Sequence, residues 1–226
     1  MAAWESVSIH AKAMPVALTL RQAKSARTRA ARPAPSEPRE FQRFGIRKMY
    51  TEILKFWFQE IDAKLWFATD KDFDDLIRRR FLAVMQQAAA GELYSWRATA
   101  EGRLAEIIVL DQFFRNVYRN TSRAFSQDPI ALVLAQEAVV SRALTSLTPT
   151  QRGFLLLPYM HSESRQIHVV AEALYREFAL PENLKFELMH KAIIDRFGRY
   201  PHRNEILGRN STPEELEFLT QPGSRF

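Results

Sequence analysis

The sequence predicts an all-α fold, and three observations support this prediction. Three helix starts, Asp128-Pro129, Thr148-Pro149 and Thr212-Pro213, each place a side-chain acceptor before a proline that suits the first helical position. Apolar residues recur at helical spacing between such starts. The sequence contains no run of strict apolar–polar alternation and no Asn-Gly or Asp-Gly turn that would indicate strands. We therefore expect seven or eight helices between residues 51 and 220, joined by short loops.

The first long helix is expected to begin near Asp70 and to end before Gly91. One apolar stripe follows its length: Phe73, Ile77, Phe81, Val84 and Ala88. Gly91 suits the position after the helix, where a left-handed backbone is common. The aromatic residues that precede this helix, at positions 56–58 and at Trp66, are expected to be core anchors.

Further helices are expected over residues 103–119, 130–144 and 167–178. Gln151 and Glu215 each stand three residues after a threonine that precedes a proline, which predicts two capping boxes. One more helix is expected to end near Phe197, and a short one near Ile206 to end at Gly208. The consensus of the 34-residue helical-hairpin repeat is not visible, so a compact bundle and a short solenoid both stay open.

Basic charge is concentrated at the start of the chain. The 226 residues carry a formal net charge of +6. Residues 1–48 hold ten Lys and Arg residues against three acidic ones, a net of +7, so the remainder has a net charge of −1. A segment rich in Ala, Arg, Ser and Pro buries too little apolar surface to fold. We expect a disordered basic tail over residues 1–48 and an all-α domain over residues 49–226.

Three interpretations of this tail stay open. It can be an organellar transit peptide, because it is rich in arginine and poor in acidic residues. It can be an arm that binds nucleic acid through its charge. It can also be sequence upstream of a true start at Met49, because the regular patterns begin there. The folded body is nearly neutral and is not expected to bind nucleic acid.

Composition excludes several classes of site. The chain has no cysteine, which rules out disulfides, thiol nucleophiles and cysteine-ligated metal centres. No stretch approaches the ~20 apolar residues of a membrane-spanning helix. We expect a soluble, cytoplasmic protein that has no cofactor, no bound metal and no membrane partner; the oligomeric state is not indicated.

A polar arc on the helix over residues 103–119 is the first candidate site. At 100° per residue its members fall within about 140° of one another: Asp111, Gln112, Arg115, Asn116 and Arg119. The helix is apolar nearly all round at its start, which predicts a buried central helix whose polar groups need partners. The alternatives are a structural ion pair with stitching amides, or the wall of a ligand site.

Glu106 stands on the apolar face of the same helix. It can reach the helix end and stay solvated. If it is buried instead, desolvation would raise its pKa and make it a candidate proton carrier.

The second candidate site is the stretch from Tyr159 to Glu163. Pro158 is expected to stop the preceding apolar run, so that this stretch forms a loop and Ser162 caps the next helix. His161 and Glu163 would then lie near a helix N-terminus, which favours anions. A hydrogen-bonding structural histidine is the alternative, and two possible ligands two residues apart are weak evidence for a metal site.

The third candidate site is the stretch from Asp195 to Asn204. It interleaves Arg196, Arg199 and Arg203 with aromatic residues, His202 and a Gly…Pro turn. Guanidinium groups suit carboxylates or phosphates, and Phe197 and Tyr200 suit a flat or apolar part of a ligand. The alternative is a loop whose arginines cap helix C-termini.

Several motifs of the chain resemble one bacterial family. They are Leu110-Asp111-Gln112-Phe113-x-Arg115-Asn116-x-Tyr118-Arg119, His161-Ser162-Glu163, the stretch 196–204, Leu207-Gly208-Arg209, Ile53-Leu54-x-Phe56-Trp57-Phe58, Gly91-Glu92-Leu93-x-x-Trp96 and the stretch 211–215. Over residues 50–226 the chain is similar to the bacterial family catalogued as domain of unknown function 924. The resemblance implies an all-α fold similar to tetratricopeptide-like helical-hairpin domains, and it implies no activity. Phe114 departs from the family pattern, and residues 1–48 have no counterpart in it.

The first function hypothesis is a binding module. A groove of the helical scaffold would hold an anionic small molecule, such as a phosphorylated metabolite, or an acidic peptide. The ligand-binding candidates combine cationic, polar and aromatic side chains: Asp111, Arg115, Asn116, Arg119, Tyr159, His161, Glu163, Arg196, Arg199, Tyr200, His202, Arg203 and Asn204.

The second hypothesis is an acid–base enzyme, such as a hydrolase. The catalytic candidates are histidines and carboxylates: His161, Glu163, His202 and Glu106, with Asp111 able to orient a histidine. This hypothesis requires a histidine within hydrogen-bond reach of a carboxylate in a closed pocket. Both hypotheses expect Arg115, His161 and Arg199 to lie around one hollow.

Overall fold

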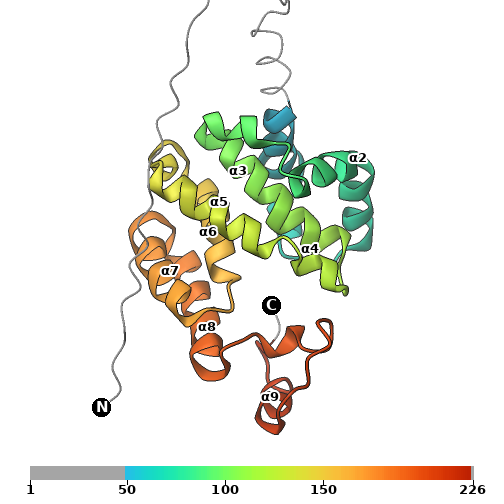
Figure 1. The fold of residues 1–226 in the computed structure, drawn as a ribbon, viewed down its shortest axis with the longest axis vertical. Helices are drawn as coiled ribbons and strands as arrows, with labels where there is room; N and C mark the ends of the chain where they lie inside the picture. Colours follow the sequence, from blue (N-terminus) through green and yellow to red (C-terminus); the bar gives the residue numbers. More distant parts are fainter. Residues whose placement is uncertain (1–48, 225–226) are drawn as a thin grey trace, which may run out of the picture. The chain divides into compact units, whose positions relative to one another are not determined.

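The computed structural model describes residues 49–224, and helices are the regular elements of that part of the chain (Figure 1). The eight labelled α-helices, α2 to α9, agree with the seven or eight predicted, and no strand occurs in residues 49–224. The all-α prediction is therefore confirmed. The tail predicted over residues 1–48 lies outside the described residues.

Residues 49–55 are helical and lead into η1, and the elements follow in this order: η1 (Phe56–Glu60), η2 (Ala63–Leu65), α2 (Lys71–Ala89), η3 (Tyr94–Ala98), α3 (Ala100–Ile108), η4 (Val109–Phe113), α4 (Phe114–Val117), η5 (Ser122–Phe125), α5 (Asp128–Val140), η6 (Ala143–Ser146), α6 (Pro149–Met160), α7 (Arg165–Phe178), α8 (Pro181–Phe197), η7 (Pro201–Arg203) and α9 (Pro213–Phe218). Of the η elements, η1 and η4 are π-helical and the others are 3-10 helices.

Most of the predicted helix ends are confirmed by their hydrogen bonds. Thr148 and Thr212 each form a complete capping box at the start of α6 and α9. The Asp70 carboxylate accepts a hydrogen bond from the backbone N–H of Phe73 and starts α2. Gly91 follows α2 with φ of +73°, a conformation that costs glycine little. Local polar chemistry therefore fixes these boundaries.

The predicted cap at Asp128 is wrong. Gln127 is the residue that precedes α5, and Asp128 is already helical. Its carboxylate instead contacts Arg115 and Arg203. Two ion pairs with guanidinium groups outweigh the single backbone hydrogen bond that a cap would make.

The predicted loop over residues 159–163 is also wrong at its start. Helix α6 continues through Pro158 to Met160, and Ser164, not Ser162, caps α7. A proline removes one backbone donor from a helix, and burial of the apolar side chains around Pro158 outweighs that loss. His161 is consequently the C-terminal cap residue of α6.

The predicted helix over residues 103–119 is a continuous run of α3, η4 and α4, which lies at the centre of the described helices. It begins at Ala100 and ends at Val117. It packs against α2 on one side and against α5 and α6 on the other (Figure 1). Burial of its apolar residues from Leu104 to Leu110 confirms the prediction of a buried central helix.

The main core is built around aromatic side chains. Phe56 and Trp57 are buried and contact Phe113, with ring centroids 6.1 and 5.6 Å apart, as expected for core anchors. Along α2, Met85 is buried where the predicted stripe named Val84, which is half-buried. A second cluster joins Ile193, Ile194 and Tyr200.

Helices α5, α6 and α7 each pack against the next helix in the chain. The tetratricopeptide-like arrangement stays a prediction. The short helix predicted near Ile206 lies earlier, as η7, and a turn with positive φ at Gly208 follows it. Within residues 49–224, no helix combines the length and the apolar character that a membrane span requires.

Candidate functional site

One cavity of about 740 Å³ is lined by most of the polar residues that the sequence predicted to bind a ligand. Its polar wall comes from α4 and its flanks, from the end of α6 and from the η7 region: Gln112, Arg115, Asn116, Arg119, Asn120, His161, His202 and Arg203. Its apolar wall is largely aromatic and aliphatic: Trp66, Phe67, Ala124, Phe125, Leu157, Met160, Phe186, Tyr200 and Ile206. Thr69, Asn183 and His190 also reach it. Segments far apart in the sequence thus share one hollow.

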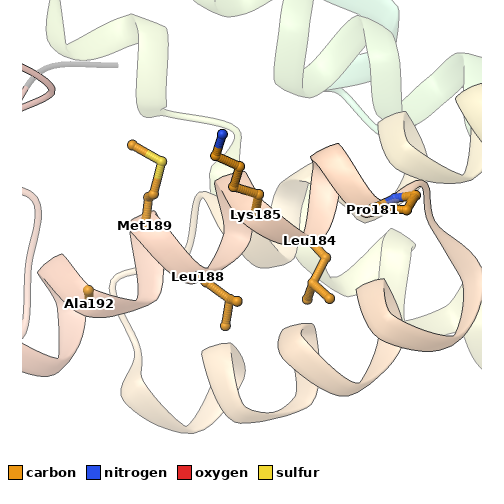
Figure 2. Close-up of a pocket in the computed structure, with 6 residues that line it drawn as sticks. All are labelled: Pro181, Leu184, Lys185, Leu188, Met189 and Ala192. Atoms are coloured by element: carbon orange, nitrogen blue, oxygen red, sulfur yellow. The ribbon is translucent and has the colours of Figure 1, made fainter.

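A second hollow lies on the surface of α8 and has a different character (Figure 2). Its lining is apolar except for one lysine: Pro181, Leu184, Lys185, Leu188, Met189 and Ala192. It holds no carboxylate, histidine or arginine, and Lys185 is its one ionisable side chain. The candidate site is therefore the cavity that His161 and Arg203 line.

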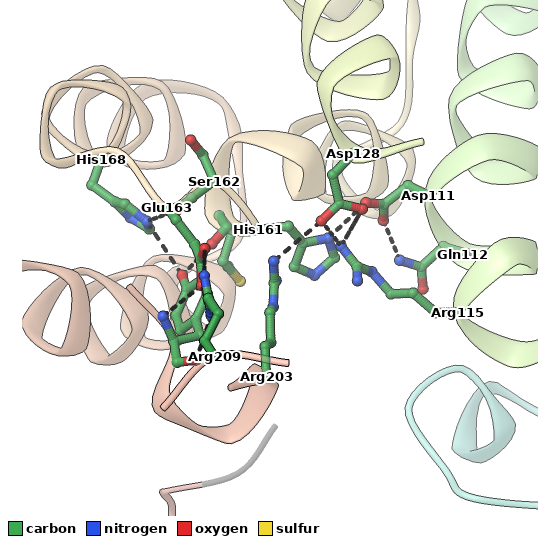
Figure 3. Close-up of polar contacts among 12 residues, drawn as sticks. Asp111, Gln112, Arg115, Asp128, His161, Ser162, Glu163, His168, Arg203 and Arg209 are labelled. Atoms are coloured by element: carbon green, nitrogen blue, oxygen red, sulfur yellow. Dashed lines mark hydrogen bonds and ion pairs between the residues drawn. The ribbon is translucent and has the colours of Figure 1, made fainter. Parts of the chain in front are cut away.

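The π-helical turn η4 positions the central carboxylate, Asp111. Its side chain is 1% exposed and accepts hydrogen bonds from three groups (Figure 3). His161 Nδ1 lies 2.7 Å from Oδ1, Arg115 Nη2 lies 3.3 Å from the same oxygen, and the Gln112 amide donates to Oδ2. A π-helical turn inserts one residue per turn, and such turns are frequent at functional sites.

Asp128 joins the two arginines of the site. Its carboxylate accepts two bonds from Arg115 Nη2, at 2.9 and 3.0 Å, and one from Arg203 Nη1, at 3.2 Å. The ring of Phe125 lies under both guanidinium groups, at 4.6 Å from that of Arg203 and 5.3 Å from that of Arg115. Asp128 thereby holds together two arginines that lie 88 positions apart in the sequence.

The electrostatics keep Asp111 ionised and His161 neutral. Burial alone would raise the pKa of Asp111, but the hydrogen bonds from His161 and Gln112 and the charge of Arg115 outweigh burial and hold that pKa well below its usual range. Burial lowers the pKa of His161, and the charge of Arg115 adds to this effect, while Asp111 opposes it. At neutral pH a neutral His161 ring donates Nδ1–H to Asp111 and keeps a lone pair on Nε2.

Each of the two guanidinium groups keeps a donor that no group within residues 49–224 accepts. Arg203 is 6% exposed, and burial lowers its pKa while leaving it a cation at neutral pH. The Nε atoms of Arg203 and Arg115 are buried and have no hydrogen-bond partner within the described residues. Buried donors of this kind are expected to have partners in the functional state.

The cavity therefore gathers part of the predicted site. Seven of the ligand-binding candidates line it: Arg115, Asn116, Arg119, His161, Tyr200, His202 and Arg203. Asp111 stands directly behind His161. Asn116 and Arg119 both bond the carboxylate of Asp74, at 2.8 Å, which holds this wall against α2. The predicted meeting of a helix, the His161 region and the η7 region is observed for these residues.

The expected meeting of Arg199 with Arg115 and His161 is not observed. Arg199 forms a two-pronged ion pair with Glu215 of α9, at 2.7 and 2.8 Å, and does not line the cavity. Arg196 pairs with Glu214 on the exposed face of α9. The opposite charge on α9, 16 to 18 residues along the chain, attracts both arginines away from the cavity.

Glu163 has a structural environment. Its two oxygens accept hydrogen bonds from Arg209 and from the backbone N–H of Tyr200, which fixes the chain between α8 and η7. Burial alone would raise the pKa of Glu163. The hydrogen bonds from Arg209, with that from the Tyr200 backbone, outweigh burial and lower this pKa. Glu163 does not line the cavity.

The remaining candidates also lie away from the cavity lining. Glu106 is buried in a two-pronged ion pair with Arg97, at 2.7 and 2.8 Å, and so does not reach the helix end. Tyr159 is buried in the core, and burial raises its pKa to about 12. Asn204 donates to Ser211 and Glu215. Glu106 and Asn204 thus have polar partners that explain their burial.

Sequence reasoning missed several residues that line the cavity or hold its arginines. Asp128 appeared only as an expected cap, although an acidic residue at a first helical position can equally face a neighbouring element. Trp66 and Phe125 gave no signal beyond packing, because an aromatic residue that lines a cavity looks like a core residue in a sequence. His190 lies on α8 with no motif around it, and burial lowers its pKa to about 3.

The described residues hold no group of three or more His, Cys, Asp or Glu side chains that could bind a metal ion. His161, His190 and His202 line the same cavity, but their arrangement does not make such a group. The chemistry open to this site from its own side chains is therefore hydrogen bonding, charge stabilisation and proton transfer.

Comparison with known proteins finds relatives of unknown function. The family described as "Bacterial protein of unknown function (DUF924)" matches residues 53–223. A solved structure of a protein of unknown function, ATU0120 from Agrobacterium tumefaciens, is 35% identical, with a TM-score of 0.73 over 76% of this chain and 97% of that chain. No curated protein matches the chain.

Proposed function

The chain belongs to the bacterial family of unknown function DUF924, and we propose that its cavity binds a small anionic molecule that has an apolar body. The single observation that carries this proposal is the pair Arg115 and Arg203. Both arginines line one cavity, and the carboxylate of Asp128 holds both of them there. Guanidinium groups held in this way suit a carboxylate or a phosphate.

Directed donors, not net charge, provide the anion specificity of the cavity. Asp111 and Asp128 balance the charges of Arg115 and Arg203, and Asp74 balances Arg119. An anion is thus recognised by the N–H groups that these carboxylates leave unused. The neutral cluster also lowers the cost of burying two guanidinium groups before the ligand arrives.

The aromatic wall suits the apolar part of the ligand. Four aromatic side chains line the same cavity as the polar residues: Trp66, Phe67, Phe125 and Phe186. A volume of about 740 Å³ lies in the range of small-molecule sites, and it is small for a folded peptide segment. A single-ring carboxylate or phosphate matches both the polar and the apolar lining.

A thermal-shift titration tests this proposal with phenyl phosphate, benzoate and the uncharged analogue benzyl alcohol. Phenyl phosphate and benzoate should stabilise the wild type, and benzyl alcohol should not. Arg203→Met should abolish the shift, because it removes the buried guanidinium. Arg196→Met, which changes an exposed arginine paired with Glu214, should keep it. Equal shifts in both variants would contradict the proposal.

A second candidate function, acid–base catalysis, is favoured by one specific distance. His161 lines the cavity and lies 2.7 Å from the buried carboxylate of Asp111. A histidine oriented by a carboxylate is a common general base. His202 lines the same cavity, whereas Glu163 and Glu106 do not. Loss of turnover in His161→Gln tests this candidate, once a substrate class is fixed.

A further inference from the structure

We propose that the cavity hydrolyses small carboxylic esters, with His161 as the general base that activates water and Asp111 as its positioning residue. This inference rests on the proposed function in one respect: the carboxylate released by hydrolysis is the anion that Arg115 and Arg203 bind. The substrate itself is an uncharged ester with an apolar body.

The orientation of His161 carries the inference. Nδ1 of His161 faces Asp111, which is buried behind the cavity wall. Since His161 also lines the cavity, the opposite edge of its ring, which carries Nε2, is the edge that faces the cavity. The His161 side chain keeps 15% of its surface exposed. In Figure 3 its ring is drawn between the guanidinium groups of Arg115 and Arg203. A base, its orienting carboxylate and two cationic groups thus converge.

Asp111 is itself held in place, as a positioning residue requires. Gln112 donates to one of its oxygens, and Arg115 donates to the oxygen that His161 contacts. These bonds fix the carboxylate and therefore the ring. They also keep the carboxylate ionised, so that it accepts the Nδ1 proton and does not compete for it.

The lining favours water as the nucleophile. Among the described residues that line the cavity there is no serine, cysteine or lysine, and the Tyr200 hydroxyl donates to the Met160 carbonyl. Thr69 is the one lining residue with an aliphatic hydroxyl. A Thr69→Val variant separates attack by that hydroxyl from attack by water.

The reaction balances within these groups. Nε2 of His161 takes a proton from water as the water oxygen bonds to the ester carbonyl carbon, and the carbonyl oxygen becomes an oxyanion. As the carbon–oxygen bond to the leaving alkoxide breaks, the imidazolium returns the proton to that oxygen. The products are a carboxylic acid, which ionises, and an alcohol.

Charge is conserved inside the cluster during this step. Two arginines and two aspartates sum to zero, and the new imidazolium is matched by the new oxyanion. The guanidinium groups of Arg203 and Arg115 line the cavity in which the oxyanion forms. A buried site that keeps its net charge constant avoids a large desolvation cost in the transition state.

Hydrolysis of p-nitrophenyl butyrate by the purified full-length chain tests the proposal. His161→Gln should lower the rate about 100-fold, as expected for loss of a general base. Asp111→Asn should lower it at least about tenfold, while the exposed control Arg196→Gln should keep it. A wild-type rate no higher than that of His161→Gln overturns the proposal, and a loss in Thr69→Val equal to that in His161→Gln overturns the role of water.

Two further readouts separate catalysis from folding and from binding. The wild-type rate should rise with pH to a plateau, with its midpoint below pH 6.5, because burial lowers the pKa of His161. In Asp111→Asn the midpoint should move to still lower pH, because the carboxylate that raises that pKa is gone. A ¹⁵N NMR spectrum of the wild type at pH 7 should show the His161 ring protonated at Nδ1 only, and protonation at Nε2 overturns the proposal without any variant.

Butyrate distinguishes failure of this inference from failure of the proposed function. If butyrate stabilises the protein but no His161-dependent hydrolysis occurs, the cavity binds anions and the catalytic inference is wrong. If hydrolysis depends on His161 but butyrate neither binds nor inhibits, the catalytic inference holds and the anion-binding function is wrong.

Discussion

Asp128 shows how one carboxylate can order a site at the scale of a residue. It pairs with arginines 13 positions before it and 75 positions after it. Without this carboxylate, the buried guanidinium group of Arg203 and the half-buried one of Arg115 would face each other over the ring of Phe125. Its contribution is therefore to stability and to anion recognition together.

An Asp128→Asn substitution should destabilise the protein by about 2–3 kcal/mol, because it leaves two guanidinium groups without their shared counter-ion. Urea unfolding measures the loss. The matched control is Asp195→Asn, whose exposed side chain pairs with Lys191 and should cost less than about 0.5 kcal/mol. Phosphate should restore more stability to Asp128→Asn than to the wild type, and a loss equal to the control would contradict the bridging role.

Glu215 should make stability dependent on acid pH. The Arg199 side chain is the main cause that lowers the pKa of Glu215 to about 2, against the opposing effect of burial. A folded pKa below the unfolded value of 4.5 gives stability above pH 4.5 that is lost as the pH falls toward 2. Glu215→Gln should be less stable than wild type by roughly 2–3 kcal/mol at pH 7.

The difference between these two proteins should shrink as the pH falls below 4.5 and should be about 0.4 kcal/mol at pH 2, where Glu215 is half protonated in the folded state. Unfolding free energies measured from pH 7 to pH 2 check this dependence. A difference that stays constant over that range would show that Glu215 contributes through its shape and not through its charge.

The sequence predicted the residues that cap helices better than it predicted which carboxylate each arginine pairs with. Thr148 and Thr212 act on their own backbone within three residues, so the sequence is sufficient to assign them. Arg199 and Arg115 have the same side chain and lie in equally suggestive motifs, yet one pairs with α9 and the other enters the cavity. The choice depends on distant carboxylates, which a single sequence does not place.

At the scale of the element, the π-helical turn η4 changes what the periodic pattern can predict. The assumption of 100° per residue places Asp111, Arg115 and Arg119 on one face. An extra residue in the turn at 109–113 rotates the residues after it relative to those before it. The sequence therefore identified the buried helix and its polar residues, but not that Asp111 lies behind the wall that Arg115 lines.

Gly102 controls how closely η3 approaches α3. A Cβ atom at this position would lie 2.0 Å from the backbone carbonyl oxygen of Trp96, and backbone cannot move aside cheaply. Gly102→Ala should therefore destabilise the protein by about 3 kcal/mol, measured by urea unfolding. Gly91→Ala is the control: it has open space and pays only for positive φ, about 1 kcal/mol. Equal costs at both sites would contradict the close approach.

At the scale of the whole molecule, the cavity exists only because separate segments meet. Residues 66–69, 112–125, 157–161, 183–190 and 200–206 each contribute to its lining. Helical class and helix order were predictable, because caps and periodicity are local. The cavity walls were only partly predictable, because the packing of α4, α6 and η7 depends on long-range contacts such as the Arg203–Asp128 pair.

Phe67 at the cavity rim should contribute to ligand binding and little to folding. Its side chain is 72% exposed, and its ring stacks on Phe154 at 6.0 Å. Phe67→Ala should weaken phenyl phosphate binding about fivefold, equivalent to about 1 kcal/mol, measured by isothermal titration calorimetry. Tyr94→Ala, which removes an equally exposed aromatic side chain away from the cavity, should leave the affinity unchanged.

The most direct measurement is a crystal structure of the protein grown with phenyl phosphate. Density for the phosphate group should lie within hydrogen-bond distance of the Arg203 and Arg115 guanidinium groups, with the ring against the aromatic lining. Phosphate density bound only elsewhere on the surface, with Arg115 and Arg203 contacting nothing beyond Asp111 and Asp128, would contradict a cavity that recognises anions.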